Sequence, residues 1–325
     1  EEACDLAKKY QMEALALTDH GNMFGVIEFY QIAIKHGIKP IVGCEIYVSP
    51  GSRFEKKTVV GTEGAYHLTL LVKNRTGYFN LIKLVSLGHL EGFYYKPRVD
   101  KELLSKYNEG LIALSGCLKG EIAVHANRGE MKKAIQSAGE YQKIFGDRRF
   151  FIEMQNNGVE NQLLVNDRLL EIGHQLSLPV VATNDCHYLH RKDAKAHEIL
   201  ICIQTGKTLQ DSYRMKFSSD EFYFKSPQEM VDLFQNTPEA ISHTVEIAEQ
   251  CNLELRFEEK HIPRIVVPSG ESLDSYLEKL SKTGLEKKLI SHQEEIGFKE
   301  RSIKYFARLE EELSIIESMG YSGYF

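Results

Sequence analysis

The segment LALTDHG (residues 15–21) sets the expected fold of this chain. It is a short apolar run, as expected for a buried strand, and it ends abruptly at a carboxylate, an imidazole and a glycine. The same pattern recurs in IVGCE (41–45) and in PVVATNDCH (179–187). When several buried strands carry metal-ligand residue types at the same end, a parallel barrel with a metal site at its C-terminal mouth is the simplest interpretation.

Length and composition indicate a globular protein with a large core. The 325 residues are 42% hydrophobic and 26% charged, which suits one α/β barrel with a smaller appendage. No apolar run approaches the roughly 18 residues of a membrane span. The net charge of −6 argues against a strongly basic nucleic-acid clamp. The six cysteines form no CxxC pair, so we expect reduced thiols in a cytoplasmic protein.

Up to about residue 190 the chain alternates predicted strands with predicted helices, as a parallel sheet with helical crossovers requires. The expected strands are Ala14–Thr18, Pro40–Val48, His67–Lys73, Gly110–Gly116, Phe150–Gln155 and Pro179–Asp185. The expected helices between them are Met23–His36, Tyr78–Leu87, Met131–Phe145 and Val159–Leu176. A barrel of about seven or eight strands is favoured. An open doubly wound sheet is the alternative, although no GxGxxG follows any strand.

The composition changes after residue 193. We expect a helix over 194–205, a strand pair over Met215–Lys225, and helices that begin at Ser226-Pro227 and at Pro238. The segment VVPSG (266–270) is typical of a linker, and two charged amphipathic helices follow it. We therefore predict a barrel domain over residues 1–268 and a helical region over 269–325.

Candidate metal ligands lie at the boundaries of several predicted strands. They are His20, Glu45, His67, Asp185 and His187. Histidine and carboxylates are ligands of zinc and manganese, and Asp185 and His187 would share one face if their strand continues. A single histidine at a strand end is more often a hydrogen-bonded structural residue. It is the coincidence at several strands that favours a metal cluster.

Four other residues have weaker claims to a role. Asp19 could accept a hydrogen bond from a ligand histidine. Cys117 also follows a predicted strand, but its pattern alone favours an inert buried thiol. Lys96 and Arg98 have aromatic neighbours and could contact a substrate phosphate, although a solvated loop explains them equally well.

Several blocks of the sequence resemble one known family. ALTDHGN (16–22), KPIVGCE (39–45), HLEGFYYKPR (89–98) and ATNDCHY (182–188) resemble the PHP (polymerase and histidinol phosphatase) domain of the alpha subunits of bacterial DNA polymerase III. IQTGK (203–207) and MGYSGYF (319–325) resemble later parts of those subunits, the second being similar to the segment that leads into the polymerase palm.

The resemblance implies an α/β fold of a particular kind. This is a distorted (βα)7 barrel, lacking its first strand in this chain, followed by a helical segment that leads into the palm. The intact family domain holds two or three zinc or manganese ions. The positions that match its ligands are His20, Glu45, His67, Cys117, Asp185 and His187, with Glu45 as the bridging carboxylate. The family's His-x-His motif on the first strand and the magnesium-binding polymerase aspartates lie outside this sequence.

Three functions follow from the resemblance. The metal cluster could hydrolyse phosphodiesters as a 3′→5′ exonuclease inside a replicative DNA polymerase. It could instead be a structural metal site in a scaffold that braces the polymerase and docks a proofreading exonuclease. A free-standing phosphatase similar to histidinol phosphatases is the third alternative. The implied partners are primer-template DNA, the proofreading exonuclease, the sliding clamp and a clamp-loader subunit, with no membrane.

Overall fold

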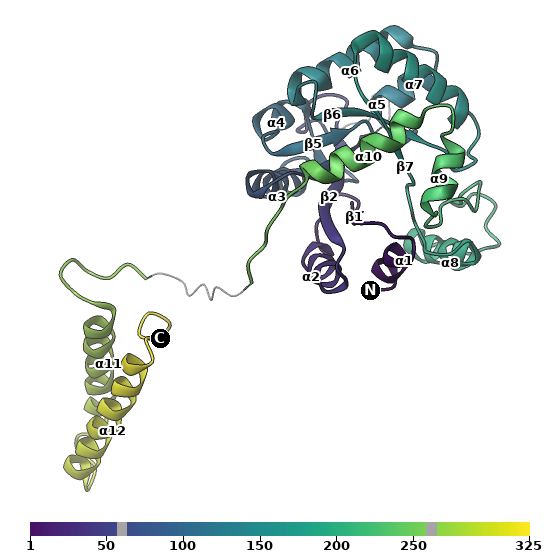
Figure 1. Cartoon of the computed structure of the whole chain (residues 1–325). Coiled ribbons are helices and arrows are strands. Elements are labelled where there is room, and N and C mark those ends of the chain that lie inside the picture. The colour runs from purple at the N-terminus through teal and green to yellow at the C-terminus, as the bar shows by residue number, and fades with distance from the viewer. Residues whose placement is uncertain (57–63, 258–264) are drawn as a thin grey trace. The chain divides into compact units, whose positions relative to one another are not determined.

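The computed structural model describes residues 1–56, 64–257 and 265–325 (Figure 1). The chain divides into two compact units, Glu1–Glu254 and Leu255–Phe325. The predicted boundary at 268/269 follows residues 258–264, which are outside the described part of the chain, and that position stays a prediction. The second unit contains two helices, α11 (Leu273–Ile290) and α12 (Phe298–Ser318).

The first unit is built around a seven-stranded sheet. Its strands are β1 (Ala14–Leu17), β2 (Lys39–Val48), β3 (Tyr66–Val72), β4 (Arg98–Val99), β5 (Leu111–Leu114), β6 (Phe150–Gln155) and β7 (Val180–Thr183). The spatial order is β1-β2-β3-β5-β6-β7, and β4 pairs with β2. Because the order follows the sequence without a reversal, the sheet is of barrel type rather than doubly wound. The predicted α/β fold is confirmed as a mixed half-barrel.

The prediction of a purely parallel sheet is wrong at β3. This strand runs antiparallel to both of its neighbours, β2 and β5, whereas the other pairings are parallel. Among the described residues, no helix lies between β2 and β3. This agrees with the reversal, because an antiparallel neighbour requires no crossover helix.

Ten α-helices surround this sheet in the described part of the first unit. They are α1 (Glu2–Lys9), α2 (Val26–His36), α3 (Arg75–Leu90), α4 (Lys101–Lys106), α5 (Glu121–Asn127), α6 (Met131–Phe145), α7 (Gln162–Leu176), α8 (Ala194–Thr205), α9 (Pro227–Leu233) and α10 (Pro238–Gln250). Local capping explains several helix starts. The Asn74 side chain accepts from the Gly77 N–H, and Ser226 forms a capping box with Glu229 at the start of α9.

The predicted strand pair over Met215–Lys225 is wrong. This segment has irregular backbone, with one isolated bridge between Tyr188 and Tyr223. Its alternating aromatic residues serve a different purpose. Phe217 and Phe222 pack edge to face, with ring centroids 4.5 Å apart, and both contact the ring of His187. Period-2 alternation therefore reflects a local aromatic cluster here rather than a strand ladder.

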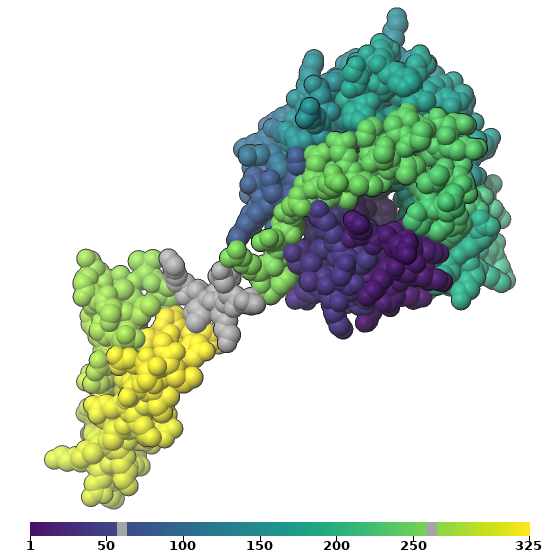
Figure 2. Space-filling model, in the orientation of Figure 1, coloured from purple at the N-terminus to yellow at the C-terminus, as the bar shows by residue number. Residues whose placement is uncertain are grey.

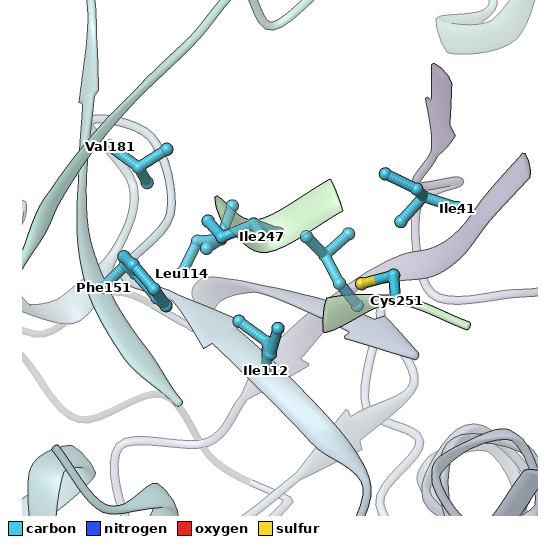
Figure 3. Packing of buried hydrophobic residues seen from close by; sticks show 8 residues of the cluster. Ile41, Ile112, Leu114, Phe151, Val181, Ile247 and Cys251 are labelled. Atoms are coloured by element: carbon cyan, nitrogen blue, oxygen red, sulfur yellow. The ribbon is translucent and has the colours of Figure 1, made fainter. Parts of the chain in front are cut away.

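The apolar core lies inside the half-barrel and is closed by α10 (Figure 3). Its members come from β2, β3, β5, β6 and β7 on one side and from α10 and its C-terminal end on the other. They include Ile41, Leu71, Ile112, Leu114, Phe151, Val181, Ile247 and Cys251. Buried aliphatic and aromatic side chains of this kind supply most of the stability of such a domain. Packing in this core fixes the position of each strand along the half-barrel, and therefore where the residues at the end of each strand lie.

The sheet path ends at β1 and β7, and no hydrogen-bonded pair joins these two strands in the described part of the chain. A cavity of about 900 Å³ lies there, lined by residues of both strands and of α9 and α10. Its opening is visible between the N-terminal segment (purple) and the green helices in Figure 2. Within the described residues, no helix is long and apolar enough to cross a bilayer.

Candidate metal centre

The centre begins with the pairing of β2 and β3. In this antiparallel register Glu45 lies opposite Thr69, and Tyr47 lies opposite His67. Opposite residues share a face of the sheet, and so do residues two apart on one strand. Glu45 and His67 are therefore diagonal neighbours, and the Nδ1 atom of His67 lies 2.8 Å from Oε1 of Glu45.

Cys117 joins this pair through a tight turn after β5. Gly116 has φ +84°, and a Cβ atom built on it would lie only 2.5 Å from the His67 carbonyl oxygen. Glycine alone allows both this conformation and this close approach. The turn brings the Cys117 Sγ atom to 3.6 Å from Nδ1 of His67. The ligand atoms of Glu45, His67 and Cys117 all lie within 4.8 Å of one another.

His20 reaches the same carboxylate from β1. The parallel pairing of β1 with β2 continues as a bridge between His20 and Glu45, with the Gly21 N–H donating to the Glu45 carbonyl at 2.8 Å. The Nδ1 atom of His20 lies 2.7 Å from Oε1 of Glu45. Two imidazoles therefore converge on one buried carboxylate oxygen.

The charges at the centre are strongly coupled. Burial alone would raise the pKa of Glu45, but the hydrogen bonds from His20 and His67 outweigh it and hold the pKa at about 2. The Glu45 hydrogen bond raises the pKa of His20 in return. Burial raises the pKa of the Cys117 thiol far above its usual range. The thiol is therefore protonated unless a cation replaces the proton.

Asp185 and His187 lie on the other side of the centre, directly after β7. Asp185 has φ +50°, a left-handed conformation that aspartate adopts more readily than most residues. Its Oδ1 atom lies 3.3 Å from Nε2 of His187. The rings of His187 and His20 are stacked, with centroids 5.8 Å apart. All six candidate ligands thus lie around one rim, although Asp185 and His187 lie outside the tight group of Glu45, His67 and Cys117.

Asp19 and Arg98 have other surroundings than the sequence led us to expect. Among the described residues, no hydrogen bond joins the Asp19 carboxylate to a histidine, and Asp19 acts on His20 through its charge. Arg98 is 2% exposed, and its guanidinium donates to the carbonyls of Gly92 and Glu55. These hydrogen bonds tie the Arg98 side chain to the neighbouring loops. We therefore do not assign Arg98 to a substrate phosphate.

Glu153 is a residue of this region that the sequence patterns did not single out. It lies on β6, is 5% exposed, and lines the cavity together with Glu45 and Asp185. Burial raises its pKa to about 7. Its signal in the sequence is one acidic residue inside the otherwise uncharged strand FFIEMQ (150–155).

The donor set fits a divalent transition metal. One carboxylate, two imidazoles and a thiol are the ligand types of zinc, and carboxylate with imidazole also suits manganese. The geometry gives an independent reason. Two histidine nitrogens and a thiol lie close to Glu45, and among the described residues this buried carboxylate forms ion pairs with imidazoles alone. A metal ion could be held by Glu45, His67 and Cys117 together, and His20 lies next to the same carboxylate.

Comparison with known proteins agrees with this geometry. Residues 1–157 match the model of the family described as PHP domain. Residues 1–157 are thus similar in sequence to PHP domains. The chain is 44% identical to DNA polymerase III subunit alpha of Borreliella burgdorferi, over 98% of this chain and 27% of the relative. It is 42% identical to the protein of the same name from Treponema pallidum, over 98% of this chain and 27% of the relative. It is 47% identical to that of Thermus aquaticus, over 84% of this chain and 23% of the relative.

The PHP-type distorted barrel predicted from the sequence is therefore confirmed. The similarity to DNA polymerase III alpha subunits covers nearly the whole chain, including the helical unit that follows the PHP domain. The chain spans about a quarter of the length of these curated relatives. Activities of the whole relatives therefore bear on this chain only as proposals.

Proposed function

We propose that this chain is the PHP region of a replicative, DNA-directed DNA polymerase, and that its metal centre hydrolyses phosphodiesters at a DNA 3′ end. The observation that carries the proposal is the convergence of Glu45, His67 and Cys117 within 4.8 Å, with His20 on the same carboxylate. The names of the relatives support the replicative context and DNA as the substrate.

The residues would hold zinc or manganese in the following way. Glu45 is placed to bridge ions, because its carboxylate is approached by histidines from two different strands. His67 and Cys117 would bind on its buried side, and His20, Asp185 and His187 on the side of the cavity. Metal ions bound there would polarise a phosphodiester and lower the pKa of a bound water toward neutrality.

The chain's own groups prepare the site for this chemistry. Glu45 stays ionised across the physiological pH range because the two imidazoles hold its pKa at about 2. Asp185 and His187 face the cavity of about 900 Å³, which is large enough to admit the end of a nucleotide chain. Glu45, His67 and Cys117 therefore anchor metal, while the partly exposed pair Asp185 and His187 meets the substrate.

The test is metal-dependent release of nucleotides from the 3′ end of a DNA strand by the intact protein. We expect Asp185→Ala with His187→Ala to reduce this release by at least about 100-fold. Cys186→Ala is the matched control, because Cys186 lies between the two residues, is exposed, and donates to the Tyr188 carbonyl. Full hydrolysis in the double variant would refute the catalytic proposal.

A structural role is the second candidate, and the burial of one side of the centre favours it. Glu45 is 7% exposed, and a cysteine ligand such as Cys117 is typical of structural zinc sites. In that case the metal contributes folding free energy, and the domain braces the polymerase and docks a proofreading exonuclease, a clamp and a clamp-loader subunit. Chelation would then lower the melting temperature with no hydrolysis to lose. The free-standing phosphatase is not proposed, because the similarity to the polymerase subunits continues through the helical unit.

A further inference from the structure

Glu153 is a buried carboxylate beneath the candidate ligands. It is 5% exposed and makes no ion pair with a described residue, although a buried carboxylate normally requires a cation. It lies between two layers of the half-barrel. Phe151, two residues earlier on β6, belongs to the apolar core below, and the metal ligands form the rim above.

Its first set of contacts leads to the buried side of the centre. Oε2 of Glu153 accepts from the Gly116 N–H at 2.9 Å and from the Thr69 hydroxyl at 3.2 Å. Gly116 immediately precedes Cys117, and Thr69 lies two residues from His67 on the same face of β3. The Glu153 carboxylate therefore connects the two elements that carry these ligands.

Its second set of contacts leads to the open side. Oε1 of Glu153 accepts from the Thr183 hydroxyl at 2.6 Å and from the Gln155 amide at 3.3 Å. Thr183 lies two residues before Asp185, at the end of β7. The Glu153 side chain thus contacts residues next to the ligands on both the buried and the open side of the centre.

We propose that Glu153 is a positioning residue of the metal centre, which fixes the ligand-bearing ends of β3, β5 and β7 relative to one another. Its backbone adds to this role, because the Glu153 N–H donates to the Ser115 hydroxyl at 2.8 Å, in the same turn as Cys117. The inference rests on the metal site of the proposed function and holds whether that site is catalytic or structural.

In this structure all four groups around the carboxylate donate to it, and the Gly116 N–H can do nothing else. A glutamine in its place offers one oxygen, and its NH2 group faces two of these groups. The hydroxyl or amide on that side would have to turn to accept, and the turn at Gly116 or the end of β7 would shift. Groups that orient metal ligands in this way typically change metal affinity by about 10–100-fold when they are removed.

The experiment is a titration of the intact, metal-free protein with Co²⁺, which reports affinity and, through the thiolate charge-transfer band, the Cys117–metal bond. We expect Glu153→Gln to weaken Co²⁺ affinity by about 10–100-fold and to diminish that band at saturation. Glu121→Gln is the control, since Glu121 is also held by polar partners, but these come from α4 and α6. It should bind Co²⁺ as the unaltered chain does.

Two milder variants keep the test decisive if Glu153→Gln does not fold. Thr69→Val and Thr183→Val are nearly isosteric, and each removes one hydroxyl that Glu153 accepts. Each should weaken Co²⁺ binding several-fold, with unchanged circular dichroism. Affinity and band equal to those of the unaltered chain in every folded variant would overturn the inference. Failure of the unaltered chain to bind Co²⁺ would instead refute the metal site itself.

Discussion

The two sides of the metal centre differ in how firmly the fold places their residues. On the buried side, Glu45, His67 and Cys117 come from strands or turns that are hydrogen-bonded to one another, and their ligand atoms lie within 4.8 Å. On the open side, Asp185 and His187 follow β7, at the end of the sheet path.

This difference shows what a sheet contributes to a metal site. Register fixes the relative positions of residues on paired strands, so the buried side is formed before any ion binds. In the described part of the chain, strand β7 has one unpaired edge, which faces the cavity, so no register with a second strand fixes its position on that side. We therefore expect the buried side to determine metal affinity, and the open side to determine access and chemistry.

The largest effect should come from removing the histidine on the buried side, compared with the same change on the open side. His67→Ala removes a ligand next to Glu45 and Cys117, and it should weaken binding of the tightest ion by at least about 100-fold. His187→Ala is the matched change on the open side and should weaken that ion by less than about tenfold. Calorimetric titration with Zn²⁺ measures both. Equal losses would show that the two sides do not differ.

A smaller effect should follow from Gly116→Ala. The added Cβ meets the His67 carbonyl at 2.5 Å, and the residue must keep φ at +84°. We expect a loss of roughly 2–4 kcal/mol in the free energy of unfolding, and weaker metal binding through Cys117. Gly129→Ala is the control, since it also has positive φ but nothing within 4 Å. Equal destabilisation in urea would mean that the close approach to His67 is unimportant.

The smallest effect concerns pH in the metal-free chain. The pKa of Glu45 is held at about 2, below its ordinary value of 4.5. The stability that comes from the ionised form of Glu45 is therefore lost as the pH falls from 4.5 toward 2. The unaltered chain should lose about 1–2 kcal/mol more than Glu45→Gln over this interval, as measured by urea unfolding at each pH. Parallel curves for the two proteins would contradict this.

Much of the fold could be predicted from the sequence, because the signals are local. The strand limits at β1, β2 and β6 follow from apolar runs, and the polar residues that interrupt or follow these runs include Glu45, inside β2, and His20, after β1. The direction of β3 could not be predicted, because a short buried strand has the same pattern in either direction. The irregular segment 215–225 was mistaken for strands because aromatic packing can produce the same alternation.

Site residues could be predicted from the sequence only where a typical metal-ligand residue lies at or near the end of an apolar run. Histidines and acids at strand ends drew attention, whereas Cys117 required the turn at Gly116, which brings it to His67. Glu153 was overlooked because its role depends on donors from three other elements. Arg98 was misjudged because sequence does not reveal that backbone carbonyls enclose its guanidinium.

Side chains that are far apart in the sequence should bind the same ions at one rim of the half-barrel. Anomalous diffraction from crystals of the intact protein grown with zinc, recorded on both sides of the zinc absorption edge, tests this directly. We predict a peak bonded to Glu45, His67 and Cys117, with any further peak between Glu45 and the pair Asp185 and His187. Zinc bound elsewhere, with these side chains hydrogen-bonded only to one another, would contradict the account.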